Sequence, residues 1–517
     1  MAAQGHSHRP QRQMAKGDRM VTGIQRKPVL LAGAACIALA AHPAGAQQAD
    51  RTAVLEQRVR QLEEALRDVR QELEATKRQQ SQAAATQSPT EVAPAAGPVA
   101  SAVAPVTTPS QTTVAAVPPE EPPTQPKSAS SQSAQAQPPG TGFRVGNTTF
   151  RLSGFIKADA IVSDYRDGDT ATNSLGRDFY LPQFIPVDDA PGEGADFDAH
   201  AKQTRIILTT ETPVGDEVVA AHIESDFQTS PGTQGSERTT NGYNFALRRA
   251  FITYDGWTFG QDWSNFQNVT VLPEAADFVG VTEGTIFVRQ MQVRYTHEFS
   301  KQFAMAFALE NPETSSITPA APVLVENDDD HLPDATLKLT YTPSFGQFTL
   351  SGLARQLSVN TPIEKERSFS WGVSAAGRIP FGKDGPYDIR FMLTYGKGIG
   401  RYVGFNFAPD VLYLADTAGG GADLERVDVL AGFVAFRIGF TDKLRTNIMG
   451  SFQDVDYPTG LAPATANENA HSVAVNLFYS PVKPLDLGIE YRYGRRKLLN
   501  GDTGKLNRVH FVAKHAF

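Results

Sequence analysis

The last residues of the chain, Lys505–Phe517, read KLNRVHFVAKHAF and decide the fold. Residues two apart in a β-strand share a face. One face is mostly apolar or aromatic and consists of Phe517, His515, Ala513, Phe511 and Val509. The other face is largely basic and consists of Ala516, Lys514, Val512, His510 and Arg508. The segment is therefore predicted to be a strand with one apolar side and one polar side.

A final amphipathic strand that ends on an aromatic residue is typical of bacterial outer-membrane barrels. Phe517 then resembles the signal that the barrel-assembly machinery reads. A soluble β-sandwich could end on the same kind of strand. The rest of the chain has to distinguish the two.

Composition narrows the class of protein. The chain has 517 residues, of which 40% are hydrophobic and 20% charged, with a net charge of -8 and a mean hydropathy of -0.30. No apolar run of roughly 20 residues follows residue 46, so no membrane helix is expected in the mature chain. Barrel strands escape such a test because their apolar residues alternate with polar ones. The only cysteine, Cys36, lies in the N-terminal apolar segment, so the mature protein is expected to have none. A chain without cysteine can form no disulfide scaffold, cysteine nucleophile or thiolate metal site. We expect no metal and no cofactor.

Residues 1–46 resemble a signal peptide. Arg26 and Lys27 precede the apolar segment 29–41, and residues 44–46 form a small-residue cleavage site. The polar leader before Met20 leaves either Met1 or Met20 as the start. Lipoprotein processing at Cys36 is disfavoured, because the apolar run continues past it and Gly33 stands where a lipid-attachment motif needs Leu.

Residues 47–80 are predicted to form a short coiled coil in the periplasm. Apolar residues recur at alternating spacings of four and three: Leu55, Val59, Leu62, Leu66, Val69 and Leu73. Oppositely charged flanking pairs such as Arg58 and Glu63 favour a parallel trimer. One amphipathic helix lying on another surface is the alternative. Residues 81–147 are rich in Ala, Pro and Ser and are predicted to be a disordered linker.

Residues 148–517 are predicted to form an all-β, 16-stranded antiparallel transmembrane barrel. Segments of alternating polarity lie at 148–165, 200–212, 217–228, 244–254, 257–263, 285–298, 301–311, 334–342, 347–358, 368–379, 386–396, 425–440, 443–454, 470–480, 485–496 and 504–517. Short turns such as Asp255-Gly256 alternate with long loops such as 166–199 and 397–424. An even strand number with turns at one end and loops at the other is the outer-membrane barrel pattern, and a soluble sandwich has no reason to show it.

The polar face of each strand then lines the lumen. Ten basic residues fall on this face: Lys157, Arg205, Arg294, Lys338, Arg355, Arg378, Arg390, Arg445, Arg492 and Arg508. Acids on it are fewer: Asp159, Glu224, Asp226, Asp388 and Glu490. The planar fork of a guanidinium matches a carboxylate or phosphate, so this lumen favours anions. We expect the solute pathway to include Lys157, Arg205, Arg294, Lys338, Arg355, Arg390 and Arg492. Each arginine could instead pair with an inward acid and brace the wall, and the sequence leaves both roles open.

Loop 264–284 reads SNFQNVTVLPEAADFVGVTEG, which is unusually apolar for an exposed loop. Exposure of so much apolar surface to water is unfavourable, so we expect the loop to fold into the barrel and narrow it. The predicted constriction residues are Trp263, Phe266, Leu272 and Phe278.

Two short motifs carry a family resemblance. Leu247-Arg248-Arg249-Ala250-Phe251 and Gly260-Gln261-Asp262-Trp263-Ser264-Asn265-Phe266 resemble the DcaP-like porins, as does the order of signal, coiled coil, linker and barrel. The resemblance implies a homotrimeric outer-membrane porin for small anionic organic solutes such as dicarboxylates. No contact motif of the family carries individual substrate-binding residues over to this chain.

Three alternatives remain. A phosphate or polyphosphate channel fits the same basic lumen. An outer-membrane hydrolase is disfavoured because His222, His297 and His471 are scattered without a recognisable Ser or Asp partner. A trimeric adhesin contributes only a few strands per chain, so sixteen strands argue against it. We therefore expect a channel that is no enzyme and binds no nucleic acid. The loop acids, such as residues 188–189 and 328–330, either bind lipopolysaccharide through divalent cations or are solvated.

Overall fold

The structure is a computed structural model that describes residues 142–172, 174–187, 192, 194–228, 242–327, 330–361, 365–383, 385–415, 422–458 and 460–517. All of these residues belong to the second of two compact units of the chain, residues 120–517. The expected signal peptide, the expected coiled coil and the linker before residue 142 lie outside the described residues. The same holds for the loop acids at 188–189 and 328–329.

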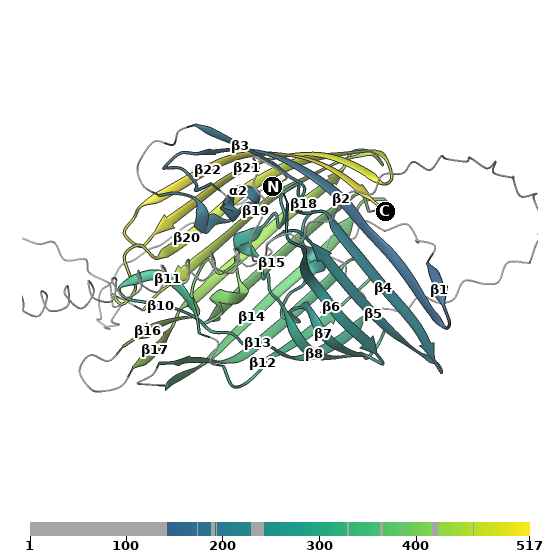
Figure 1. The fold of residues 1–517 in the computed structure, drawn as a ribbon, viewed down its shortest axis with the longest axis horizontal. Coiled ribbons are helices and arrows are strands. Elements are labelled where there is room, and N and C mark those ends of the chain that lie inside the picture. Colours follow the sequence, from purple (N-terminus) through teal and green to yellow (C-terminus); the bar gives the residue numbers. More distant parts are fainter. Residues whose placement is uncertain are drawn as a thin grey trace, which may run out of the picture. The chain divides into compact units, whose positions relative to one another are not determined.

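Sixteen antiparallel strands close into a barrel, as predicted (Figure 1). Each predicted segment overlaps one of them. In order they are β2 (Thr148–Tyr165), β4 (Arg205–Val214), β5 (Glu217–Asp226), β6 (Ala246–Tyr254), β7 (Trp257–Trp263), β8 (Arg289–Glu298), β9 (Phe303–Glu310), β12 (Asp334–Tyr341), β13 (Gln347–Asn360), β14 (Lys365–Phe381), β15 (Tyr387–Lys397), β18 (Asp428–Gly439), β19 (Leu444–Asp456), β20 (Asn467–Val482), β21 (Leu485–Leu498) and β22 (Thr503–Ala516).

The C-terminal strand β22 closes the barrel against β2. The paired residues run from Phe155–Ala516 to Tyr165–Leu506. The terminal Phe517 continues this pairing, because its N–H donates to the Gly154 carbonyl and its own carbonyl accepts from the Gly154 N–H, both at 3.0 Å.

Two further strands adjoin β2. The first is β1 (Phe143–Val145), which pairs with the start of β2 and lies inside the stretch 81–147 that the sequence assigned to a disordered linker. Its Phe143 ring stacks on Phe150 at 5.2 Å. The second is β3 (Ala195–His200), which pairs with residues 159–164 of β2 while β4 pairs with residues 149–155. The predicted segment 200–212 began at residue 200, which belongs to β3, and β4 begins five residues later, at Arg205.

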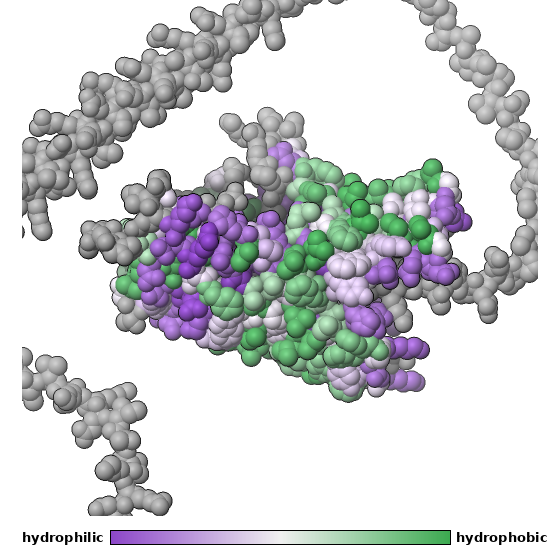
Figure 2. Space-filling view, turned by 90° about the horizontal axis from the view of Figure 1, so that it is seen from below, coloured by the Kyte–Doolittle hydropathy of each residue, from purple (hydrophilic) through white to green (hydrophobic). Residues whose placement is uncertain are grey.

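The two faces of the wall follow the predicted alternation. In β22, Phe511 is 47% exposed, whereas Arg508, His510 and Val512 are buried. Figure 2 shows apolar residues gathered across the visible face of the barrel, with hydrophilic residues on either side of them. An apolar belt with polar rims matches a hydrocarbon layer between two aqueous phases. Within the described residues, no helix is both long and apolar enough to cross a membrane.

The long connections carry structure that strand periodicity did not reveal. A separate four-stranded sheet joins two of them, with β10 (Ser315–Thr318) next to β11 (Ala321–Glu326) and to β16 (Val411–Leu414), which pairs with β17 (Asp423–Arg426). The helical turns are α2 (Leu175–Asp178), η1 (Pro182–Phe184), η2 (Val269–Val271), η3 (Thr282–Gly284) and η4 (Gly400–Tyr402). The alternation of turn and loop lengths is not strict, because the connections 361–364 and 499–502 at the loop end are short.

Candidate functional site

The connection between β7 and β8, residues 264–288, lies inside the barrel, and we call it the inner loop. The backbone of one loop residue, Ala276, forms hydrogen bonds with side chains of two strands. Its carbonyl accepts from Lys157 Nζ of β2 at 2.6 Å, and its N–H donates to Glu490 of β21 at 2.9 Å. Asn268 Nδ2 donates to Thr349 Oγ1 of β13 at 3.0 Å. Contacts to inward side chains of strands so far apart in the sheet place the loop within the lumen. It is longer than predicted, because β8 begins at Arg289 and not at residue 285.

Most apolar residues of the inner loop pack into a core and do not face an opening. Phe266 and Leu272 of the loop are 1% and 5% exposed, and Trp263, the last residue of β7, is 3% exposed. Phe278 is the partly buried member of the predicted constriction set, and its ring lies 5.2 Å from the Arg248 guanidinium. Burial of the loop's apolar face against the wall stabilises its inward position. Three of the four predicted constriction residues therefore lie in this core, and Phe278 packs against it beside the Arg248 guanidinium.

Asp277 ties the inner loop to the connection between β2 and β3. Its carboxylate accepts hydrogen bonds from the N–H groups of Tyr180 at 2.7 Å and of Val279 and Gly280 at 3.1 Å. Burial on its own would raise the pKa of Asp277. The charges of Arg492 and His510 and the Tyr180 N–H outweigh burial, so the pKa of Asp277 is lowered from 3.8. The carboxylate is thus held in its ionised form.

A continuous ion-pair network covers the lumen face of β4 to β8. At one end, Glu224 and Asp226 of β5 both pair with Arg205 of β4, each at 3.2 Å. They also pair with Arg248 of β6, at 2.8 and 2.6 Å. The Arg248 and Asp226 side chains are almost completely buried. Buried charges of opposite sign satisfy each other here and hold three strands in register.

The network continues through Arg249 and Asp262. Arg249 of β6 contacts Glu224 at 3.3 Å and Asp262 of β7 at 2.7 Å. Asp262 also binds Arg294 of β8 at 3.0 Å. Two of the predicted pathway residues, Arg205 and Arg294, are thus brought together by carboxylates that they share with neighbouring arginines.

A β-bulge explains how two successive arginines both face the lumen. Glu224 pairs with Arg249 and Ser225 pairs with Leu247, so Arg248 is the extra residue in β6. Strict alternation would have directed one of the two arginines toward lipid, at a cost of about 2–4 kcal/mol near the bilayer midplane. The bulge turns Arg248 inward to its carboxylate partners.

Arg289, at the start of β8, adds a fifth guanidinium near two carboxylates of the network, Glu224 and Asp226. It lies over the Trp263 ring at 5.2 Å. Among the described residues, the Arg289 guanidinium donates no hydrogen bond and forms no ion pair. Positive charge is therefore in excess on this side of the barrel.

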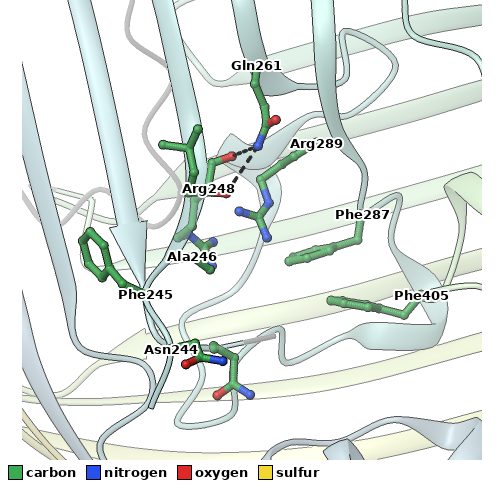
Figure 3. A pocket seen from close by; sticks show the side chains of 10 residues that line it. Asn244, Phe245, Ala246, Arg248, Gln261, Phe287, Arg289 and Phe405 are labelled. Atoms are coloured by element: carbon green, nitrogen blue, oxygen red, sulfur yellow. Dashed lines mark hydrogen bonds between the residues drawn. The ribbon is translucent and has the colours of Figure 1, made fainter. Parts of the chain in front are cut away.

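A cavity of about 740 Å³ lies beside these residues (Figure 3). The last residue pair between β6 and β7 is Ala250–Gln261. Gln261 and the start of β6, residues 246–248, which β7 leaves unpaired, line the cavity. There the Gln261 side chain donates to the Arg248 carbonyl at 3.0 Å. Arg248 and Arg289 project into the cavity, and Phe287 and Phe405 lie together on another side of it.

Three other predicted pathway residues, Arg355, Arg492 and Lys157, are buried and form ion pairs with acidic residues. Arg355 of β13 has a fully buried side chain and contacts two buried carboxylates, Asp334 at 3.2 Å and Asp410 at 3.1 Å. Arg492 of β21 pairs with Glu490 at 2.9 Å, and its side chain is 2% exposed.

The third of these residues, Lys157 of β2, contacts Asp159 at 3.0 Å and has an 8% exposed side chain. Lys338 of β12 is partly buried, and its ammonium donates to the Gln267 carbonyl of the inner loop at 3.3 Å. Both lysines therefore help to hold the wall or the inner loop.

Arg390 belongs to a second basic cluster, at the turn end of β14, β15 and β18. It shares Asp388 with Arg378, at 2.7 and 3.0 Å. Arg437 lies next to Asp388 across the β15–β18 ladder and donates to the Pro386 carbonyl at 3.4 Å. The Arg378 side chain is 42% exposed. Three guanidiniums around one carboxylate again leave positive charge facing the lumen.

Comparison with known proteins decides the family. A family model described as DcaP outer membrane protein matches residues 142–517. The chain belongs to this family. The crystal structure of the outer membrane channel DcaP of Acinetobacter baumannii is similar, with 26% sequence identity and a TM-score of 0.58, over 73% of this chain and 99% of that one. OmpT of Vibrio cholerae is 12% identical, with a TM-score of 0.45, over 73% of this chain and 100% of that one. None of the curated proteins compared matches this chain. The protein is thus a DcaP-family outer-membrane barrel with a porin fold.

Sequence reasoning missed Arg248, Arg249 and Arg289 in this DcaP-family barrel. The adjacent pair Arg248-Arg249 within a lipid-facing strand was the available signal, because only a bulge lets both face the lumen. Arg289 had no signal, since its position depends on where the inner loop ends. Within the described ranges, no group of three His, Cys, Asp or Glu residues is arranged to hold a metal ion. His222 lies 3.4 Å from Glu224 and stacks on Phe251.

Proposed function

We propose that this protein is a passive channel for small anionic organic solutes, dicarboxylates among them, and that it catalyses no reaction. We propose further that it is a homotrimer in contact with lipopolysaccharide, that Phe517 is read by the barrel-assembly machinery, and that the N-terminal coiled coil lies in the periplasm. The observation that carries the solute class is the excess of guanidiniums over carboxylates in the network of β4 to β8.

The position of the excess charge favours anions over cations. In a narrow lumen that is partly closed by the inner loop, charge is less screened than at a free surface. A guanidinium binds a carboxylate through two parallel N–H donors, which chloride or a cation cannot use in the same way. A dicarboxylate has two such groups and can be attracted by both basic clusters in turn.

The arginines are not equivalent in this role. Arg294 and Arg378 keep 16% and 42% of their side chains exposed, whereas Arg355 is fully buried between two acids. A residue must reach the solvent of the lumen to act on a passing ion. We therefore assign selectivity to Arg294 and Arg378 and a bracing role to Arg355.

Selectivity can be tested in planar bilayers. We expect the wild-type channel to prefer chloride over potassium in a KCl gradient, and the double variant Arg294→Gln, Arg378→Gln to shift toward potassium. Removing a unit charge about 4 Å from the passing ion weakens their attraction by about 1 kcal/mol even in water, so each of the two substitutions should lower the permeability ratio by roughly fivefold.

Lys301→Gln is the control for removal of a positive charge outside the lumen, because Lys301 is an exposed residue of the β8–β9 turn. It removes one unit charge, as each of the two arginine substitutions does. Block of the chloride current by succinate, compared with block by inorganic phosphate, separates a dicarboxylate channel from a phosphate channel. A wild-type channel without anion preference, or a reversal potential that the double variant leaves unchanged, would contradict the proposal.

A further inference from the structure

The cavity between β6, β8 and the inner loop has a cationic end. Arg248 is neutralised by its pairs with Glu224 and Asp226. Arg289 projects into the same space, and no described residue accepts a hydrogen bond from it. Its charge is therefore available to a ligand that enters the cavity. The Trp263 ring at 5.2 Å holds the guanidinium without neutralising it.

The cavity also has an aromatic side. The Phe287 and Phe405 rings are stacked, with centroids 4.3 Å apart and planes 25° apart. Figure 3 shows both rings together on one side of the cavity, with the two arginines nearby. The volume of about 740 Å³ lies within the range of small-molecule sites. A cationic group beside an aromatic surface can accommodate a carboxylate and a flat apolar group of one molecule.

Phe405 adopts an unusual backbone conformation that presents its ring in this way. Its φ is 57°, and the next residue, Asn406, has a φ of 60°. Left-handed φ values cost energy in a bulky non-glycine residue. The Gln183 side chain donates to the Phe405 carbonyl at 2.8 Å and helps to hold this turn. A strained turn that places an aromatic ring in a cavity is an arrangement expected at a binding site.

We propose that this cavity is an outer binding site for organic carboxylates that carry a flat apolar group, with Arg289 as the carboxylate-binding residue and Phe287 and Phe405 as the apolar surface. The inference rests on the proposed anion pathway and adds a site and a ligand class to it. A small inorganic anion or acetate would engage Arg289 alone. An aryl group also removes apolar surface from water and packs on the two rings, so an aryl carboxylate should bind more tightly than acetate.

Trp263 provides a direct measure of binding. It contacts Arg289 and lies 4.7 Å from the Phe287 ring, edge to face. The chain has three tryptophans, and the other two, Trp257 and Trp371, lie on strands of the wall. Changing these two to Phe leaves Trp263 as the single reporter in the full-length protein in detergent.

Titration of this reporter protein with benzoate and with acetate tests the site. We expect a saturable change of Trp263 emission with benzoate and an affinity for acetate at least tenfold weaker. Arg289→Gln should abolish the benzoate response, and Phe405→Leu should reduce benzoate affinity to about that of acetate. Lys301→Gln should respond as the parent does. Calorimetric titration with benzoate provides a readout that does not depend on the Arg289–Trp263 contact, and heat modifiability on gels confirms that each variant is folded.

Two results would overturn the proposed site: equal affinity for benzoate and acetate, or benzoate binding that persists in folded Arg289→Gln. The outcome is separable from that of the channel proposal. If the wild-type channel shows no anion preference but benzoate binds and Arg289→Gln abolishes binding, the site stands and the channel proposal fails. If the channel prefers anions but benzoate leaves Trp263 and the calorimetric signal unchanged, the site is refuted and the channel proposal stands.

Discussion

At the scale of single residues, burial separates arginines that sequence alternation treats alike. Arg355 and its partners Asp334 and Asp410 all have side chains with no exposed surface. Removing one member of such a group leaves an uncompensated charge in a dry environment, which typically costs about 3–5 kcal/mol. Arg294, with 16% of its side chain exposed, can be replaced while water solvates its partner.

We predict that Arg355→Gln destabilises the barrel and leaves its ion preference unchanged. The temperature at which the folded band converts to the unfolded band on gels should fall far more than for Arg294→Gln. The reversal potential of the surviving Arg355→Gln channels should equal that of the wild type. A stable Arg355→Gln barrel with a shifted reversal potential would assign Arg355 to the pathway.

At the scale of elements, the inner loop depends on a few anchors at its middle. Asp277 accepts three backbone N–H bonds, and Glu274 pairs with Arg445 of β19 at 2.5 Å. Hydrogen bonds to a charged group contribute about 1.5–3 kcal/mol each. The loop should therefore behave as a fixed part of the lumen at neutral pH.

The pKa of Asp277 sets the pH range of this anchor. The pKa of Asp277 is lowered from 3.8 in the folded protein. The ionised carboxylate therefore stabilises the folded position of the inner loop fully above the usual pKa, and this stabilisation is lost as pH falls through the lowered pKa. We predict quiet single-channel currents from pH about 8 down to about 4, and increased current noise only below that range. Asp277→Asn should be noisy already at pH about 7, since the amide oxygen accepts fewer and weaker bonds. Quiet currents in Asp277→Asn at neutral pH would show that other contacts suffice to hold the loop.

At the scale of the whole molecule, the sixteen barrel strands of the described residues close on one another. Every barrel strand lies between residues 148 and 516, and β22 pairs directly with β2. The preceding strand β1 adds three paired residues to β2. The barrel and the N-terminal segment should thus be separable.

We predict that residues 148–517 alone, refolded in detergent, give a heat-modifiable band and a β-sheet circular dichroism spectrum. Residues 142–517 should behave in the same way with slightly higher stability, because β1 and the Phe143–Phe150 stack are kept. The full chain with Leu62→Asp and Leu66→Asp, which disrupts the predicted coiled coil, should also fold its barrel, and native mass measurement reports whether trimers persist. Loss of sheet signal in both shortened chains would show that the preceding segment takes part in folding.

Local sequence determined the strands, their order and their faces. A period of two is imposed by the geometry of each strand and by the contrast between lipid and lumen, so segments such as 257–263 and 148–165 were located to the residue. Loops obey no such period, and for that reason the sheet of β10, β11, β16 and β17 and the true start of β8 were not found.

Only the tertiary structure decided what the inward residues do. Alternation placed Arg355 and Arg294 on the lumen side, but it contains no information about which carboxylate stands opposite or how deeply the pair is buried. The bulge at Arg248 and the position of Arg289 depend on the register between β5 and β6 and on the packing of the inner loop. Local sequence sets which face a side chain takes, whereas its charge partner and its exposure are set by residues far away in the chain, because the closed barrel and the inner loop bring those residues together.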